Sequence, residues 1–112
     1  MDPAEAVYQF VRTIPTGKVV TYGQVSGMVE GFSISPRQVG GIMFAAPKDV
    51  PWQRVVGAGG HLSISKRSPE LKMKQRQLLE SEGVKFLPND CVDMANYQWL
   101  SEAPAQAGLF AE

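Results

Sequence analysis

The sequence has little of the chemistry that disulfides and metal sites require. Its 112 residues include one cysteine, Cys91, and one histidine, His61. A single cysteine excludes an intramolecular disulfide, and these two residues stand at no spacing that zinc ligands use. We therefore expect no metal site and no cofactor.

Long apolar runs are also missing. No stretch approaches the roughly 18 to 20 apolar residues that cross a bilayer, and the N-terminus lacks a basic region followed by an apolar one. We expect a soluble intracellular protein without membrane contact, cytoplasmic and nucleoid-associated in a bacterium or nuclear in a eukaryote. A chain of this length with 44% hydrophobic residues builds one core. We predict a single, monomeric domain over residues 1–103 and a mobile tail over 104–112.

Net charge is absent too, but the charges are unevenly distributed. Residues 1–79 carry ten lysines and arginines against five acidic residues, whereas residues 80–112 carry one against six. A basic segment of this kind is typical of a nucleic-acid surface. Two other interpretations stay open: these are ordinary solvated faces, or the acidic last third serves a protein partner.

Helix start signals are explicit in the first half. Residues 2–5 (DPAE) combine an N-cap, a first-turn proline and a capping-box glutamate, and predict a helix that ends near Thr13. Residues 21–24 (TYGQ) and 35–38 (SPRQ) predict two more helices, which end at Gly31 and Pro47. The last two fit a helix-turn-helix, the second being the candidate recognition helix. Residues expected to face inward are Val7, Phe10, Val11, Val25, Met28, Val29, Val39, Ile42 and Met43.

The second half has weaker signals. Residues 48–56 read as an extended segment, and the glycines at 57–60 indicate a loop or hairpin with weak register. Residues 68–70 (SPE) start a helix that Gly83 should close, and 84–86 read as a short strand. The pattern predicts a mainly α fold with a small β element.

The recognition helix has an unusually bare surface at Gly40 and Gly41. Such a helix can approach another backbone closely, as entry into a minor groove only about 6 Å wide would require. The alternative is close packing against the domain's own core. Arg37, on the first turn, is planar and permanently charged, so it could fill the gap left by an extruded nucleotide, or it could bind phosphate. Tyr22 could crowd a flipped nucleotide, or it could be ordinary packing.

Three ordered motifs identify a resemblance. Residues 14–24 (IPTGKVVTYGQ), 36–43 (PRQVGGIM) and 51–56 (PWQRVV) resemble the C-terminal DNA-binding domain of the O6-alkylguanine-DNA alkyltransferases, over residues 5–83. Trp52 stands where that family has its acceptor cysteine. With residues 65–67 (SKR), this indicates the alkyltransferase-like proteins. The resemblance implies a helix-turn-helix, winged-helix-like DNA-binding domain.

The tryptophan changes the chemistry that this site can perform. Alkyl transfer needs a thiolate activated by a base, whereas an indole has one N–H donor and no nucleophilic lone pair. A flat aromatic ring can still hold an exposed base by stacking. We therefore expect a protein that is not an enzyme.

The resemblance also implies roles for individual residues. Tyr22 resembles the tyrosine that rotates the target nucleotide, Arg37 the intercalating arginine, and Arg67 the arginine that contacts the alkylated base. Two departures are Gln53, where members often have histidine, and a loop at 57–63 that is longer than expected. The predicted flipped-base pocket comprises Tyr22, Trp52, Gln53 and Arg67, and the predicted DNA contacts are Thr21, Ser35, Arg37, Gln38, Gly40, Gly41, Arg54 and Lys66.

Three functions remain in view. The first is a non-enzymatic sensor that binds O6-alkylguanine in double-stranded DNA and, by resemblance, directs it to nucleotide excision repair proteins. The second is an alkyl acceptor at Cys91, which has no histidine or basic residue beside it in sequence and which we expect to be a buried structural cysteine. The third is a small helix-turn-helix transcriptional regulator. We expect His61 to be a solvated residue without a role.

Overall fold

The structure is a computed structural model that describes residues 2–99, except for the side chains of Ser65 and Lys66. The predicted tail at 104–112 lies outside the described residues. Helices dominate, and two short strands form the only sheet of the described part, so the predicted mainly α fold is confirmed. The elements are α1 (Pro3–Val11), β1 (Val20–Thr21), α2 (Tyr22–Met28), α3 (Pro36–Phe44), the 3-10 turn η1 (Trp52–Arg54), β2 (Val55–Val56), the 3-10 turns η2 (Ala58–Gly60) and η3 (Ser63–Lys66), α4 (Pro69–Ser81) and α5 (Met94–Tyr97).

The first three helices start where the sequence predicts. The Asp2 carboxylate accepts a hydrogen bond from the Glu5 amide at 2.8 Å, and Pro3 occupies the first turn. Helices α2 and α3 each begin with a complete capping box, in which Thr21 with Gln24 and Ser35 with Gln38 exchange hydrogen bonds. These contacts satisfy backbone N–H groups that a helix start otherwise leaves without partners.

Helix ends are less well predicted. Helix α1 ends at Val11, α2 at Met28 and α3 at Phe44, in each case two to three residues earlier than expected. The predicted inward face of α2 is also partly wrong, because Met28 is 36% exposed while Val29 is buried. Val29 has extended backbone angles that turn its side chain towards the core.

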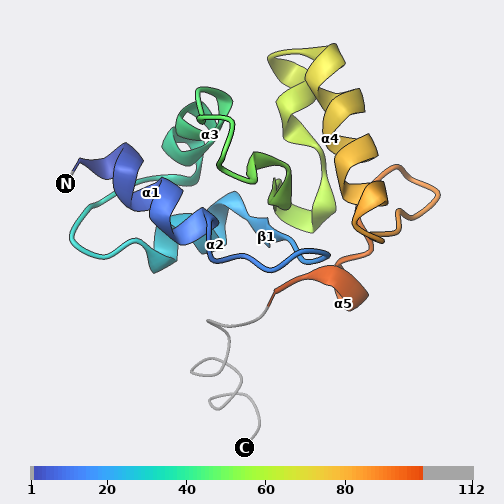
Figure 1. The fold of residues 1–112 in the computed structure, drawn as a ribbon, viewed down its shortest axis with the longest axis horizontal. Helices are drawn as coiled ribbons and strands as arrows, with labels where there is room; N and C mark the ends of the chain where they lie inside the picture. The colour runs from blue at the N-terminus through green and yellow to red at the C-terminus, as the bar shows by residue number, and fades with distance from the viewer. Residues whose placement is uncertain (1, 100–112) are drawn as a thin grey trace, which may run out of the picture.

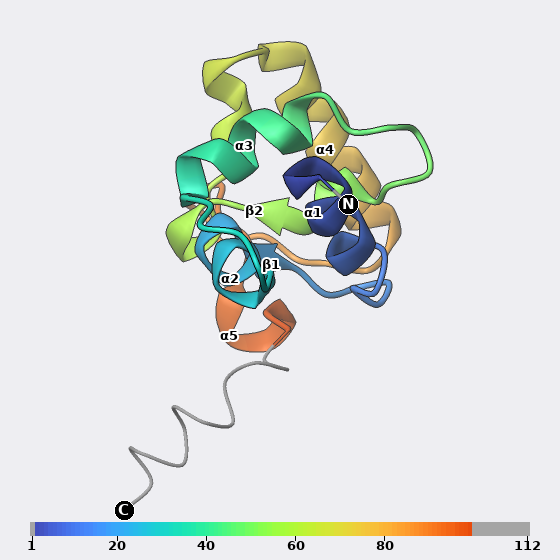
Figure 2. The same ribbon diagram turned by 90° about the vertical axis from the view of Figure 1, so that its left-hand side faces the viewer.

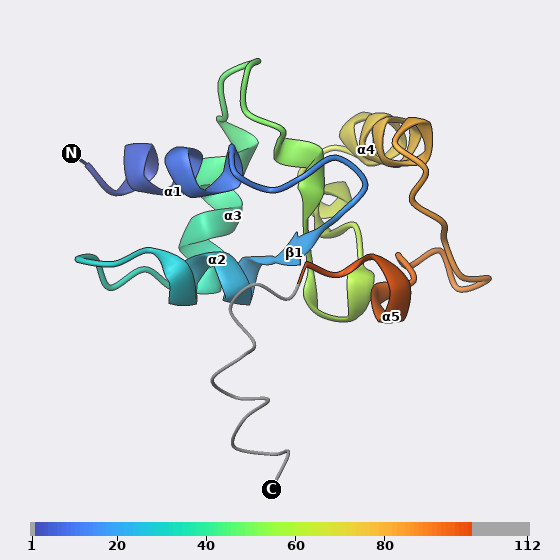
Figure 3. The same cartoon turned by 60° about the horizontal axis from the view of Figure 1, so that its bottom comes forward.

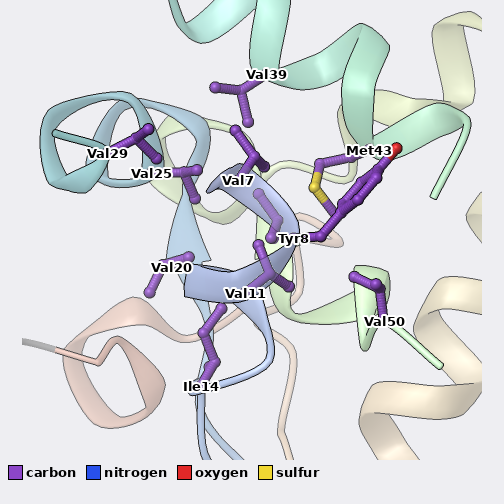
Figure 4. Packing of buried hydrophobic residues seen from close by; sticks show 11 residues of the cluster. Val7, Tyr8, Val11, Ile14, Val20, Val25, Val29, Val39, Met43 and Val50 are labelled. Carbon is purple, nitrogen blue, oxygen red and sulfur yellow. The ribbon is translucent and has the colours of Figure 1, made fainter. Parts of the chain in front are cut away.

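The N-terminal core holds α1, α2 and α3 together. Figure 4 shows side chains of α1 converging with those of α2 and α3, and the Tyr8 hydroxyl donates to the Ile42 carbonyl at 2.9 Å. Figure 2 shows the three helices gathered at one end of the molecule, in front of the strands. Helices α2 and α3 pack on each other as the predicted helix-turn-helix. The cluster comprises Val7, Tyr8, Val11, Ile14, Val20, Val25, Val29, Val39, Met43, Val50 and Val55.

The small parallel sheet lies between two hydrophobic cores. Val20 pairs with Val55, and both face the N-terminal cluster. Their neighbours Val19 and Val56 face a second cluster with Leu79 of α4, because successive side chains of a strand point to opposite faces. The sheet therefore joins the helix-turn-helix end to the α4 end, as Figure 3 shows.

The middle of the chain departs from the prediction. Residues 52–54 form the turn η1 and not an extended segment, and 58–60 and 63–66 form 3-10 turns where a hairpin was considered. Close packing explains this. A side chain at Gly60 would lie 2.5 Å from the Val92 carbonyl, and Gly60 has φ of +91°, which favours glycine.

The last third follows its sequence signals in part. Ser68 caps α4, and Gly83 follows its end with φ of +93°, as predicted. The expected strand at 84–86 is reduced to one bridge between Phe86 and Val92. The segment after α5 returns to β1, where the Trp99 amide donates to the Val19 carbonyl at 2.7 Å. Among residues 2–99, no helix has the length and hydropathy needed to cross a bilayer.

Candidate nucleic-acid interface

A cavity of about 470 Å³ lies between the helix-turn-helix and the segment around η3. It gathers side chains from distant parts of the sequence, including four predicted site residues. Its lining comprises Tyr22, Pro36, Arg37, Gly40, Ser63, Ile64 and Arg67. The structure therefore places the predicted nucleotide-rotating tyrosine, intercalating arginine and base-contacting arginine around one space.

Tyr22 enters this cavity from the first turn of α2, fixed by the Thr21 capping box. Burial raises the pKa of its phenol above the usual value, and the positive charge of Arg67 offsets part of that rise. The hydroxyl is therefore protonated near neutral pH and can donate a hydrogen bond to a phosphate or a base.

The bare part of α3 faces outward. Apart from neighbouring residues and the backbone of α3 itself, no described atom lies within 4 Å of a Cβ placed at Gly40, and a Cβ at Gly41 would meet only the Arg67 guanidinium, at 3.8 Å. The alternative that these glycines pack against the domain's own core is therefore wrong. Exposed Arg37 lies one turn before Gly40 on the same face.

Phe44 completes this face and was missed from the sequence. It is 46% exposed, and the Arg67 guanidinium lies over its ring at 5.6 Å from the ring centroid. Cation–π contact of this kind holds a guanidinium in place without using its hydrogen-bond donors. The signal was present in the sequence, because 37, 40, 41 and 44 follow the spacing of one helix face.

Trp52 lies next to this cavity and does not line it. It lines a smaller hollow of about 150 Å³ together with residues of α3, η3 and α4. Ile64 lines both spaces, so they adjoin each other. The predicted flipped-base pocket is thus split into a Tyr22–Arg67 part and a Trp52 part. The smaller hollow is lined by Met43, Phe44, Ala46, Trp52, Ile64, Leu71 and Lys74.

The two residues after Trp52 point towards Glu82. Gln53 Nε2 donates to Glu82 Oε2 at 2.8 Å, and Arg54 Nε donates to Glu82 Oε1 at 3.1 Å. The Arg54 guanidinium also donates to the Ile14 carbonyl and to Thr16. The Arg54 side chain is 15% exposed. Arg54 therefore has a structural role within the domain, and its contact with DNA stays a prediction.

Glu82 is a second residue that sequence reasoning missed. Burial alone would raise its pKa, but hydrogen bonds from Arg54, Gly17 and Gln53, with the charge of Arg54, outweigh this and lower the pKa below its usual value. Glu82 therefore stays ionised and ties the Trp52 turn to the start of the chain. Its position directly before Gly83 gave no signal beyond that of a helix end.

Gln75 fixes the same turn from α4. It is 1% exposed, and its Nε2 donates to the carbonyls of Gln53 at 3.1 Å and Val55 at 3.0 Å. These two carbonyls lie in η1 and β2, where the sequence predicted one extended segment. The bonds hold the chain in a bend that sets the direction of Trp52.

The remaining predicted contacts lie at helix starts or outside the described side chains. Thr21, Ser35 and Gln38 take part in the capping boxes, and Ser35 and Gln38 are exposed. Exposed helix starts carry backbone N–H groups that suit phosphate. The side chain of Lys66 lies outside the described residues.

Cys91 and His61 form an unexpected pair. Cys91 is 3% exposed, as expected for a structural cysteine, and His61 is exposed. The expectation that no histidine lies beside the thiol holds only along the sequence, because His61 Nδ1 is 3.3 Å from Cys91 Sγ. Neither residue lines the Tyr22 or Trp52 spaces. In the described part of the chain, no three His, Cys, Asp or Glu side chains gather as metal ligands.

Comparison with known proteins places this geometry in a family. Residues 2–84 match the family described as the 6-O-methylguanine DNA methyltransferase DNA-binding domain. The chain is 38% identical over 97 residues to a DNA base-flipping protein of Escherichia coli K12, covering 85% of this chain and 72% of that protein. It is 36% identical over 100 residues to alkyltransferase-like protein 1 of Schizosaccharomyces pombe, covering 83% of this chain and 90% of that protein.

A solved structure agrees with these matches. The crystal structure of S. pombe alkyltransferase-like protein 1 with damaged DNA containing O6-carboxymethylguanine superposes with a TM-score of 0.73 and 33% identity. The superposition covers 86% of this chain and 93% of that chain. The chain therefore belongs to the family of 6-O-methylguanine DNA methyltransferase DNA-binding domains, within its alkyltransferase-like group.

Proposed function

We propose that this protein binds O6-alkylguanine in double-stranded DNA, as a sensor that flips the damaged nucleotide out of the duplex. The observation that carries the proposal is the single cavity in which Tyr22, Arg37 and Arg67 adjoin the bare face of α3. Helix α3 docks in a widened minor groove, and Arg37 fills the space that the nucleotide leaves. The comparisons support this, since a related structure holds damaged DNA.

The energetics favour damaged bases before any alkyl contact forms. Flipping costs a few kcal/mol, and less where alkylation has already weakened pairing, while aromatic stacking returns about 1 to 3 kcal/mol per base. Each buried methylene adds only about 0.8 kcal/mol, roughly a fourfold preference. A hollow that is open to solvent therefore accepts alkyl groups of several sizes.

The protein leaves the lesion chemically unchanged under this proposal. Trp52 offers no nucleophile, and Cys91, although it has a histidine partner, is buried away from the Tyr22 and Trp52 spaces. Intact mass after incubation with alkylated DNA should be unchanged. A stable gain of one alkyl group would contradict the non-enzymatic proposal, and a Cys91→Ser variant would show whether that thiol is the acceptor.

Removal of the lesion then requires partners. We propose that nucleotide excision proteins recognise the protein on bent DNA, in the bacterial cytoplasm or the eukaryotic nucleus, and that it binds as a monomer. A reconstituted excision reaction should cut an O6-alkylguanine duplex faster when the protein is added. Unchanged excision at saturating protein would contradict this part of the proposal and leave lesion binding intact.

Competition binding tests the core of the proposal. Wild type and Trp52→Ala are compared on O6-methylguanine and unmodified duplexes at one ionic strength, because phosphate contacts depend on salt. We expect Trp52→Ala to lose about tenfold in preference for the lesion, since the stacking wall is removed. Equal preference in the two proteins would show that Trp52 does not hold the base.

A further inference from the structure

A wider hollow lies beside the Trp52 hollow and shares two of its lining residues. This outer hollow has a volume of about 540 Å³ and is lined by Lys48, Asp49, Val50, Pro51, Trp52, Gln53, Lys74 and Leu78. Trp52 and Lys74 line both the small and the outer hollow. Ile64 lines both the small hollow and the Tyr22 cavity, so the three spaces lie next to one another in the order Tyr22 cavity, Trp52 hollow and outer hollow. In Figure 1 the green segment that follows α3 lies between α3 and α4.

The outer hollow has uncompensated positive charge. Lys74 is exposed and makes no ion pair with the residues that the structure describes, whereas Lys72, on the same helix, lies 2.7 Å from Asp90. Asp49 is the only acidic residue in the lining, and its carboxylate already lies 3.0 Å from Arg12. Lys48 adds a second cation to the rim.

We propose that Lys74 makes this protein select O6-alkylguanines whose substituent carries a negative charge. The proposal rests on the lesion-binding function above and specifies its preferred substrate class. A base held at Trp52 directs its O6 substituent along the series of hollows towards Lys74. There an ammonium group beside an indole wall attracts a carboxylate more strongly than a neutral group of the same shape, because the wall excludes part of the water that would screen the charges.

The experiment uses two lesions that differ in charge and hardly in shape. One duplex carries O6-carboxymethylguanine, the second the neutral O6-carbamoylmethylguanine, and the third unmodified guanine. The full chain, Lys74→Gln and Lys72→Gln are compared on all three at low and high salt. Lys72→Gln is the matched control, because it removes the same charge from the same helix outside the two hollows that Trp52 lines.

We expect the ratio of carboxymethyl to carbamoylmethyl affinity to fall about fivefold in Lys74→Gln, which is the range of a partly exposed ion pair. In Lys72→Gln the ratio should stay within about a factor of two. The effect should shrink at high salt. The comparison of ratios cancels any general loss of DNA affinity, as in a double-mutant cycle. Lys74→Arg should keep the preference.

Two outcomes would overturn the proposal. An equal loss on all three duplexes would make Lys74 a phosphate contact, and no change in any ratio would mean that the substituent does not reach it. Failure of the underlying function looks different, because wild type would then bind the neutral lesion no more tightly than unmodified guanine.

Discussion

The outward face of α3 and the turn behind Trp52 use the same residue types in opposite ways. Arg37 and Arg67 line an open cavity, and no carboxylate pairs with them in the described structure. Arg54, two residues from Trp52, is held by Glu82 and two further acceptors. An arginine near a motif is therefore available to DNA only where the fold leaves its donors unpaired. We propose that the first region binds DNA and that the second holds the first in position.

The largest effect should come from breaking the inner region. Glu82→Ala leaves Arg54 almost buried without its anion, and the Glu82 and Arg54 side chains are 10% and 15% exposed. We expect a loss of about 3 kcal/mol in the free energy of unfolding, measured with denaturant. The exposed Glu80→Ala, which removes an ion pair with Arg76, should cost less than about 0.5 kcal/mol. Equal losses in the two variants would contradict the assignment of an inner network.

The same carboxylate should make stability depend on pH. Because its folded pKa is lowered, the stabilisation by Glu82 is fully present above the unfolded value of about 4.3 and is lost as the pH falls through the folded value. Unfolding free energy measured from pH 7 to pH 3 should fall more steeply in the wild type than in Glu82→Gln. Parallel curves would mean that Glu82 is not preferentially stabilised as an anion.

An intermediate effect is expected from the outward face, and on binding only. Arg37→Ala should weaken binding to O6-methylguanine duplexes by about tenfold, because alanine cannot fill the gap that the flipped nucleotide leaves in the base stack of the duplex. Thermal unfolding should be unchanged, since Arg37 is exposed. Arg12→Ala removes a charge that is paired with Asp49 and Glu5, and should leave binding to the same duplexes unchanged. A similar loss of binding in both variants would mean that Arg37 contributes only its positive charge.

The smallest effect has opposite signs for stability and binding. Gly40→Ala should stabilise the fold by about 0.5 to 1 kcal/mol, because alanine favours helix and its Cβ would meet no described atom within 4 Å outside the neighbouring backbone of α3. It should weaken DNA binding, since α3 could no longer approach the backbone as closely. Gly27→Ala in α2 is a matched control, as it too meets nothing within 4 Å. Unfolding and duplex binding of both variants separate the two effects, and unimpaired DNA binding by Gly40→Ala would contradict the docking of this face.

Local features were predictable because their partners lie close in sequence. Thr21 and Gln24 cap α2 and lie three residues apart, so the sequence of residues 21–24 alone predicts the start of the helix. Such signals located all three helix starts of the N-terminal half and hence the helix-turn-helix. The grouping of Tyr22, Arg37 and Arg67 followed from family resemblance, and the cavity agrees with it.

Long-range pairings were not predictable from one sequence. Gln53 meets Glu82 across 29 residues, and His61 meets Cys91 across 30. The spacing of apolar residues along the sequence does not predict such contacts. They depend on how the turns at 52–66 pack between the strands and α4. The contacts of Arg54 and the unpredicted bend at Trp52 have this origin, since Glu82 holds the guanidinium and Gln75 holds the bend. Phe44 is different, because its place on the outward face of α3 could have been found from helix spacing.

Preference for damaged over undamaged DNA is the central claim. It is tested most directly by competition between one O6-methylguanine duplex and the same duplex with guanine, at fixed ionic strength, for the wild-type protein. The arrangement of Tyr22, Arg37, Trp52 and Arg67 predicts that the lesion duplex binds at least about tenfold more tightly, as expected when flipping is eased and the base is stacked. Equal affinity for the two duplexes would contradict it.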